Sequence, residues 1–130
     1  MRIISNLFNF CLSLLFFILN FAPYSYALGN VDWVLLKENN DGKEWLDKGS
    51  IKLLPNGELS VLTKFFKNST NSNDDGTLSL YVMRINCEEK KFKDISINGI
   101  RQFNTKWQTS NNDELIDIVI ENSCSEFING

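Results

Sequence analysis

The sequence predicts an α+β domain in which an antiparallel β-sheet is followed by one C-terminal helix. From Glu58 to Lys67 the apolar residues recur at every second position, which is the period of a strand with one buried face. Asn-Gly pairs at 56–57 and 98–99 are typical of hairpin turns, because both residues tolerate a positive φ. An acidic stretch that begins after Ser110 is typical of a helix start, where the helix dipole favours negative charge.

Turn residues divide the segment 32–103 into short apolar runs, each of which predicts a strand. The predicted strands are 32–37, 43–47, 50–54, 58–67, 78–87, 92–97 and 100–103. In the strand 78–87 apolar residues occupy both faces, with Leu78, Leu80 and Val82 on one of them. We therefore expect the start of this strand to be covered on both sides.

Residues 110–121 are compatible with either a helix or a strand. Ser110 and Asp113 have the spacing of a capping box, and acidic residues crowd the turn that follows. The β-branched run at 118–120 favours a strand instead. We expect a helix over 113–121, since its apolar residues then share one face.

The N-terminal segment has the features of a secretory signal peptide. A weakly basic start precedes the apolar run 7–19, and Ser25 and Ala27 place small residues at the -3 and -1 positions of a cleavage site. The alternative is a transmembrane anchor, which needs about 20 consecutive apolar residues and is disfavoured by the shorter run. The sequence thus predicts a signal peptide over 1–27 and a single domain over 28–130, with no stable membrane span after cleavage.

Three cysteines are present, and only two of them belong to the predicted domain. Cys11 leaves with the signal peptide, so Cys87 and Cys124 remain as an even pair. An exported chain meets oxidising conditions, which predicts one disulfide between them; two free buried thiols are the alternative. A bridge of this span stabilises a fold by about 4 kcal/mol on chain-entropy grounds. A metal site is disfavoured, because two cysteines without histidine supply only half of a zinc ligand set.

Composition and charge exclude several functional classes. The chain has no histidine, which rules out Ser-His-Asp and Cys-His nucleophile systems. The net charge of -3 argues against nucleic-acid binding, which usually requires a basic face. Asp113, Glu114 and Asp117 are close enough in sequence for an acid–base pair, but the dipole of the predicted helix explains them better. We predict no catalytic residue, no metal and no cofactor.

The aromatic residues have two interpretations. One is an aromatic binding surface, formed by Trp33, Trp45, Trp107, Tyr81 and the Phe65-Phe66 pair. The other is a hydrophobic core, which we favour because aromatic residues on the strands of a small domain are usually buried. Trp107 lies just outside a predicted element and is the candidate residue for a binding surface.

A series of landmarks spans nearly all of the predicted domain. They are Asp32–Leu36, Asp47 followed by Ser50-Ile51, the strand Ser79–Cys87 with Glu88–Phe92 after it, Gly99, Trp107, Ser110 and Cys124. In this order they resemble the surface-adhesin protein E family of small exported bacterial proteins. The resemblance implies a sheet of six antiparallel strands, with a C-terminal helix tied back to it by the two cysteines and Cys124 at the helix end. The best-known member is an adhesin for host matrix and plasma proteins, although none of its binding residues can be matched here.

The functional expectation is an exported, non-catalytic binding protein that acts in the periplasm or on the outer cell surface. Its partner is expected to be a protein, bound through the sheet or its loops. One alternative is a periplasmic inhibitor or accessory factor of an envelope enzyme, since such proteins are also small, β-rich and disulfide-linked. A hydrolase that uses only carboxylates is a third, less favoured hypothesis.

Overall fold

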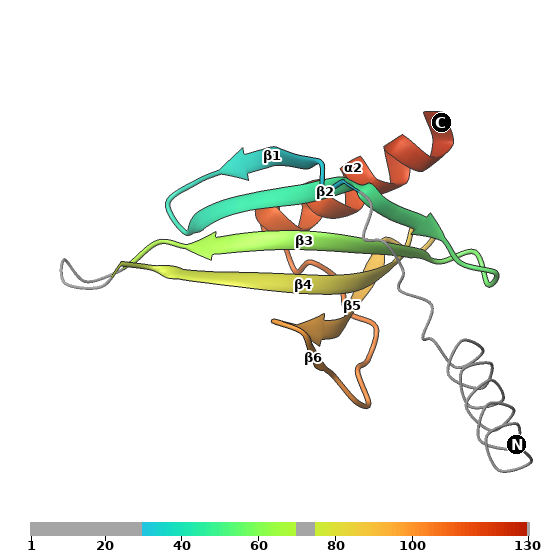
Figure 1. The fold of residues 1–130 in the computed structure, drawn as a ribbon. Helices are drawn as coiled ribbons and strands as arrows, with labels where there is room; N and C mark the ends of the chain where they lie inside the picture. The colour runs from blue at the N-terminus through green and yellow to red at the C-terminus, as the bar shows by residue number, and fades with distance from the viewer. Residues whose placement is uncertain (1–29, 70–74, 130) are drawn as a thin grey trace, which may run out of the picture.

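The computed structural model describes residues 30–69 and 75–129, which form one antiparallel sheet and one helix (Figure 1). The elements are β1 (Trp33–Glu38), β2 (Gly42–Leu53), β3 (Leu59–Lys67), β4 (Thr77–Asn86), β5 (Lys91–Ile97), β6 (Ile100–Arg101) and α2 (Glu114–Asn129). The predicted fold class, including the six strands and the C-terminal helix, is confirmed. The predicted signal peptide and its cleavage site lie outside the described residues.

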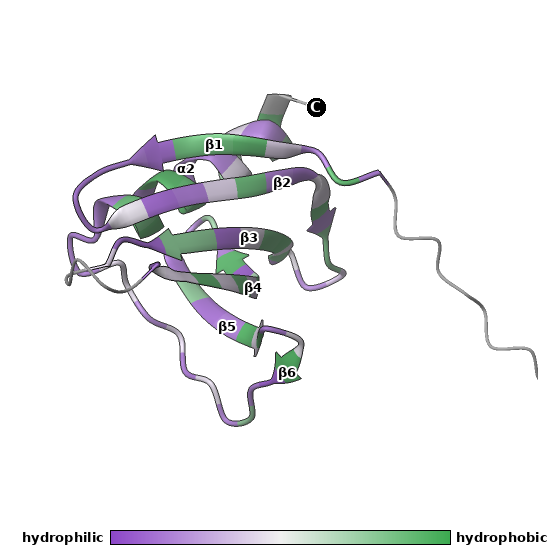
Figure 2. Ribbon diagram, turned by 60° about the vertical axis from the view of Figure 1, so that its left-hand side comes forward, coloured by the Kyte–Doolittle hydropathy of each residue, from purple (hydrophilic) through white to green (hydrophobic). Residues whose placement is uncertain are grey.

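The six strands follow one another across the sheet in the order in which they occur in the chain. Every neighbouring pair is antiparallel. Helix α2 lies against one face of this sheet, and no other described element covers the opposite face (Figures 1 and 2). We call the face toward α2 the inner face and the opposite one the open face.

The inner face carries the hydrophobic core. Residues at alternate positions of the strands point toward α2, and α2 contributes its own apolar side to the same cluster. The buried members of this core are Leu46, Leu59, Val61, Met83, Ile85, Phe92, Val119 and Ile120. Figure 2 shows hydrophilic and hydrophobic residues following one another along the strands, as expected when only one face is packed.

The two strands predicted at 43–47 and 50–54 are one long strand, β2, so their separation was wrong. Pairing of β2 with β3 is interrupted after Asp47, where the register shifts. Ser50 bridges this irregularity, because its hydroxyl donates to the carbonyl oxygen of Asp47 at 2.6 Å and accepts from the backbone N–H of Leu62 at 2.8 Å. The sequence break therefore marks a local irregularity within a strand, and the strand continues beyond it.

The C-terminal segment is helical, so the strand alternative was wrong. The cap is Asp113 and not Ser110: the Asp113 carboxylate accepts the backbone N–H groups of Leu115 at 2.9 Å and Ile116 at 3.3 Å. The helix continues to Asn129, well beyond the predicted end at residue 121. Core packing of one side of α2 outweighs the modest helix propensity of its β-branched residues.

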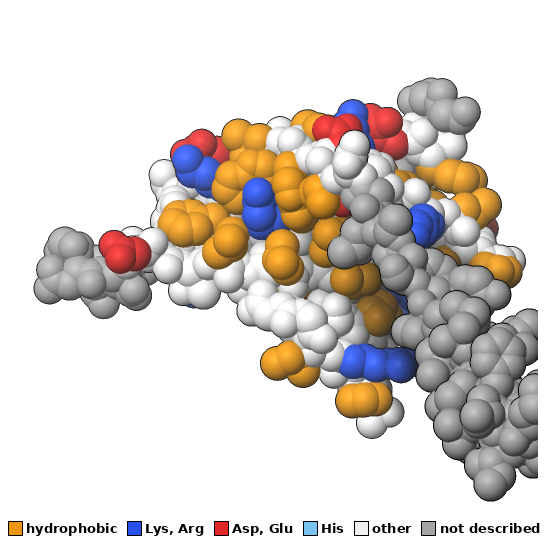
Figure 3. Space-filling view, in the orientation of Figure 1, with side chains coloured by type: hydrophobic (Ala, Val, Ile, Leu, Met, Phe, Trp, Pro, Cys, Tyr) orange, Lys and Arg blue, Asp and Glu red, His pale blue; other side chains and the backbone are white. Residues whose placement is uncertain are grey.

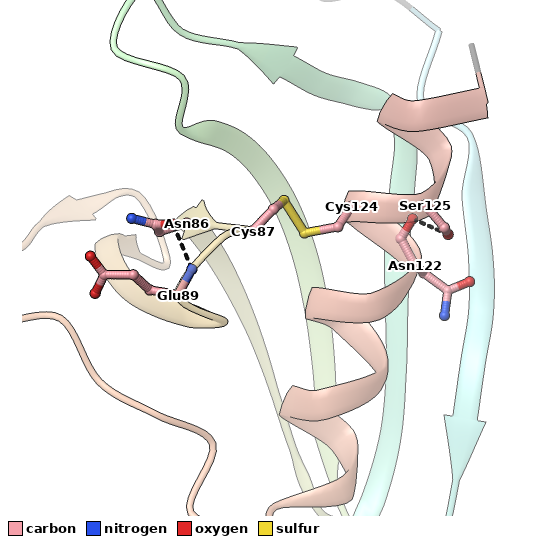
Figure 4. The surroundings of a disulfide bond; sticks show 6 residues. All are labelled: Asn86, Cys87, Glu89, Asn122, Cys124 and Ser125. Carbon is pink, nitrogen blue, oxygen red and sulfur yellow. Dashed lines mark hydrogen bonds between the residues drawn. A yellow bond between two sulfur atoms is a disulfide. The ribbon is translucent and has the colours of Figure 1, made fainter.

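The predicted disulfide joins Cys87, which directly follows β4, to Cys124 of α2 (Figure 4). Cys124 lies inside the helix, so its predicted place at the helix end was wrong. Both cysteines pack against the core cluster, and their Cα atoms are 5.8 Å apart. The bridge encloses a sequence separation of 37 residues, for which chain entropy gives about 4 kcal/mol of stabilisation.

Within the described residues, no helix is long and apolar enough to cross a membrane.

Candidate functional site

A row of four side chains crosses the open face from β1 to β4. Leu35 pairs with Trp45, Trp45 with Lys64, and Lys64 with Leu80. Residues that pair directly across antiparallel strands share a face, so these four side chains lie side by side. The same registers add further residues on either side of this row. The open-face patch consists of Trp33, Leu35, Trp45, Leu62, Lys64, Phe66, Leu78, Leu80 and Val82.

Three leucines of this patch are exposed to solvent. Leu35 is 49% exposed, Leu78 54% and Leu80 39%. The prediction that the start of β4 is covered on both sides is therefore wrong, because α2 covers only the inner face. Figure 3 shows hydrophobic side chains gathering over β1–β4 on the side away from α2, with a basic side chain among them. A contiguous apolar patch of this kind on a small domain is typical of an interaction surface.

Lys64 lies over two tryptophan rings at the centre of the patch. Its Nζ atom is 4.5 Å from the ring centroid of Trp33 and 4.7 Å from that of Trp45. The favoured assignment of these tryptophans to the core was wrong, since both lie half-buried on the open face and outside the core cluster. Among the described residues Lys64 forms no ion pair with a carboxylate, so its positive charge is not neutralised by the protein.

Trp107 forms a second lysine–tryptophan contact, which lies beside β5 on the same open face. The backbone of Gln108 pairs with Phe92 of β5, which brings Trp107 beside Lys93. The Nζ atom of Lys93 is 4.4 Å from the Trp107 ring centroid. Lys93 pairs in turn with Arg84, so it faces the open side of the sheet. Trp107 is half-exposed there, and its role in binding stays a prediction.

A cavity of about 320 Å³ lies on the other side of the sheet, between its inner face and the start of α2. Its lining residues are Glu44, Thr63, Phe65, Tyr81, Met83, Phe92, Asp94, Gln108, Asp113, Leu115 and Ile116. The lining thus includes three carboxyl groups and no basic side chain. We call this cavity the acidic pocket.

Glu44 is the most deeply buried of the three acids, with only 3% of its surface exposed. The pKa of Glu44 is raised to about 8, mainly by burial and to a smaller extent by repulsion from Asp113, while a hydrogen bond with Thr63 opposes the shift. Burial also raises the pKa of Asp94. Sequence reasoning missed both residues. The available signal was the period of β2, which places Glu44 on the same face as the core residue Leu46.

The acidic cluster at the start of α2 has the predicted structural explanation. Asp113 caps the helix, and Glu114 pairs with Lys37 of β1 at 2.7 Å. Glu114 and Asp117 occupy the first turn, where the helix dipole favours them. In the described part of the chain, no group of three or more acidic, histidine or cysteine side chains is arranged to hold a metal ion.

These features define a small, disulfide-linked domain of one sheet and one helix, with an uncovered hydrophobic face. A comparison with protein families gives a match to the surface adhesin-E family over residues 34–130. The chain therefore belongs to the surface adhesin-E family, as the order of sequence landmarks predicts. The comparisons with curated proteins and with solved structures gave no match.

Proposed function

We propose that this chain is an exported, non-catalytic binding protein whose open-face patch binds a protein partner. The observation that carries the proposal is the continuous row of Leu35, Trp45, Lys64 and Leu80 on a face that the described fold leaves uncovered. Membership of a surface adhesin family supports a binding role. Burial of apolar area contributes roughly 25 cal/mol per Å², so such a row supplies the hydrophobic centre of an interface.

The charges of the open face indicate the chemistry of the partner. Lys64 and Lys93 stack over tryptophan rings and form no ion pairs within the described residues. A complementary surface presents carboxylates opposite these two lysines and apolar side chains opposite the exposed leucines. Stacking of a sugar ring is disfavoured, because Lys64 already occupies one face of both Trp33 and Trp45.

Cross-linking from the patch tests this function. A photo-crosslinking residue at position 80, on the patch, is expected to give one discrete protein adduct in intact cells. The matched control is position 121, which is exposed on α2 at the other side of the molecule. Lys64→Glu should abolish the adduct, whereas Lys67→Glu makes the same charge change at an inward-facing, exposed position of β3 and should not. Equal adducts from positions 80 and 121, or none from position 80, would contradict the proposal.

The proposed location is the periplasm or the outer cell surface. The disulfide and the family support export. Protease treatment of intact cells separates the two locations, since a surface protein is cleaved and a periplasmic one is released only by osmotic shock. Mass spectrometry of the exported protein should give a chain that starts at Leu28. A cross-linked partner that is an envelope enzyme would favour the inhibitor or accessory-factor alternative.

A further inference from the structure

We propose that the acidic pocket is a second binding site, and that it takes an organic cation with an ammonium group on a short apolar body. The pocket lies on the inner face beside α2, so the sheet separates it from the open-face patch. This proposal does not depend on the function proposed for the patch.

The first observation is a group of three carboxyl groups with no basic side chain in the lining of the cavity. Glu44, Asp94 and Asp113 come from three different elements or segments and line the same cavity. None of them takes part in an ion pair among the described residues. The nearest basic side chain by register is Lys37, which pairs across from Glu44, but its ammonium group is bound to Glu114. A cation from outside would supply the missing partner.

The second observation is the shape and chemistry of the walls. The cavity volume of about 320 Å³ is at the lower end of the range for small-molecule sites. Phe65, Tyr81 and Phe92 line it, so the apolar body of a ligand meets aromatic surface and its charge can lie near an aromatic face. A bare metal ion would leave these walls unused, which is why we infer an organic cation.

Binding of a cation should release a proton. At pH 7 the empty pocket holds Glu44 mainly in its neutral form, because burial raises the pKa of this carboxyl to about 8. An ammonium group favours the carboxylate, so Glu44 loses its proton when the ligand binds, and affinity rises with pH up to about 8. The ionisable groups that face Glu44 from neighbouring elements are Asp94 of β5, Asp113 before α2, Tyr81 of β4 and the pair Lys37–Glu114.

The test uses simple probes of matched shape. Hexylammonium should bind the exported protein, whereas 1-hexanol, with the same chain and no charge, should bind at least about tenfold more weakly. A second arm compares Nα-acetyl-lysine methylamide with its norleucine analogue. Tighter binding of the lysine derivative than of hexylammonium would identify a lysine side chain of a partner as the source of the ammonium group. Tighter binding of hexylammonium than of the lysine derivative would identify a free amine.

Calorimetry in two buffers of different ionisation enthalpy measures the released proton directly. We expect close to one proton per bound hexylammonium at pH 7, and affinity that increases roughly tenfold between pH 6 and pH 7. Glu44→Gln should remove the proton release and weaken binding by at least about tenfold at pH 8.5. Glu121→Gln removes the same charge from an exposed position of α2 and should change neither quantity.

Two results would overturn the assignment. One is equal binding of hexylammonium and 1-hexanol, which would show that the carboxyl groups do not recognise charge. The other is unchanged affinity and proton release in a folded Glu44→Gln protein, which would place the cation elsewhere. Amide resonances of the protein in solution report whether that variant is folded.

Discussion

The inner and open faces of the sheet contain similar apolar side chains but lie in different environments. On the inner face Leu46 and Val119 are fully buried between the sheet and α2, and the same side holds the acidic pocket. On the open face Leu35 and Leu80 remain partly exposed. The contrast shows that one face maintains the fold, whereas the other is available for contacts outside it.

The largest change in the free energy of unfolding is expected when the same substitution, leucine to alanine, is made on each face in turn. Leu46→Ala should lower the free energy of unfolding by about 2–5 kcal/mol, because it leaves a cavity in the packed core. Leu80→Ala removes the same atoms from the open face and should cost less than about 1 kcal/mol. Urea denaturation of both variants measures the two values. Similar losses in the two variants would mean that the open face is packed in solution.

Removal of the disulfide tests how α2 is held against the inner face of the sheet. Cys124→Ser should lower the free energy of unfolding by up to about 4 kcal/mol, because the bridge no longer restricts the unfolded chain. Amide hydrogen exchange should speed up first in the last turns of α2, which follow Cys124. An unchanged melting temperature would show that α2 is held by packing alone. Mass spectrometry of the parent protein should find it about 2 Da lighter than its dithiol form.

The sequence was sufficient for features that depend on local chemistry. The period-two pattern of β3 and the Asn-Gly turn before it are visible in a few consecutive residues, and both predictions are confirmed. The disulfide also followed from the pairing of Cys87 with Cys124 once the predicted signal peptide, with Cys11, is set aside. These inferences need no knowledge of which distant segments meet.

The environment of each face could not be predicted in the same way. Alternation along β4 shows that Leu80 and Tyr81 point to opposite faces, but it does not show that a single helix covers only one of them. The prediction therefore placed Trp45 in the core, although it lies half-buried on the open face. Glu44 was missed for the same reason, because its burial depends on α2, which is distant in sequence.

The buried acid gives the inner face a pH dependence that the open face should lack. The pKa of Glu44 rises from 4.5 to about 8 on folding, so its stabilising contribution is complete below about pH 4.5 and is lost as pH rises through about 8. Glu44→Gln, which stays neutral, should be more stable than the parent by on the order of 3 kcal/mol at pH 9 and nearly equal to it at pH 4. Urea denaturation at several pH values measures this difference. Parallel pH profiles for the two proteins would show that Glu44 is not buried.

The smallest expected effect on stability concerns Lys64, and it separates binding from folding. Lys64→Met removes the charge but keeps an apolar chain over Trp33 and Trp45, so the free energy of unfolding should fall by less than about 1 kcal/mol. The same change should reduce the yield of the adduct from position 80 by roughly tenfold, because the partner loses its cation. Added salt should lower the parent yield and have less effect on the variant, since salt screens exposed charges. Lys67→Met is the matched control on β3 and should leave the yield unchanged. If Lys64→Met lowers both the free energy of unfolding and the adduct yield, Lys64 maintains the sheet. The loss of adduct would then follow from unfolding and would not support a separate binding role for the open face.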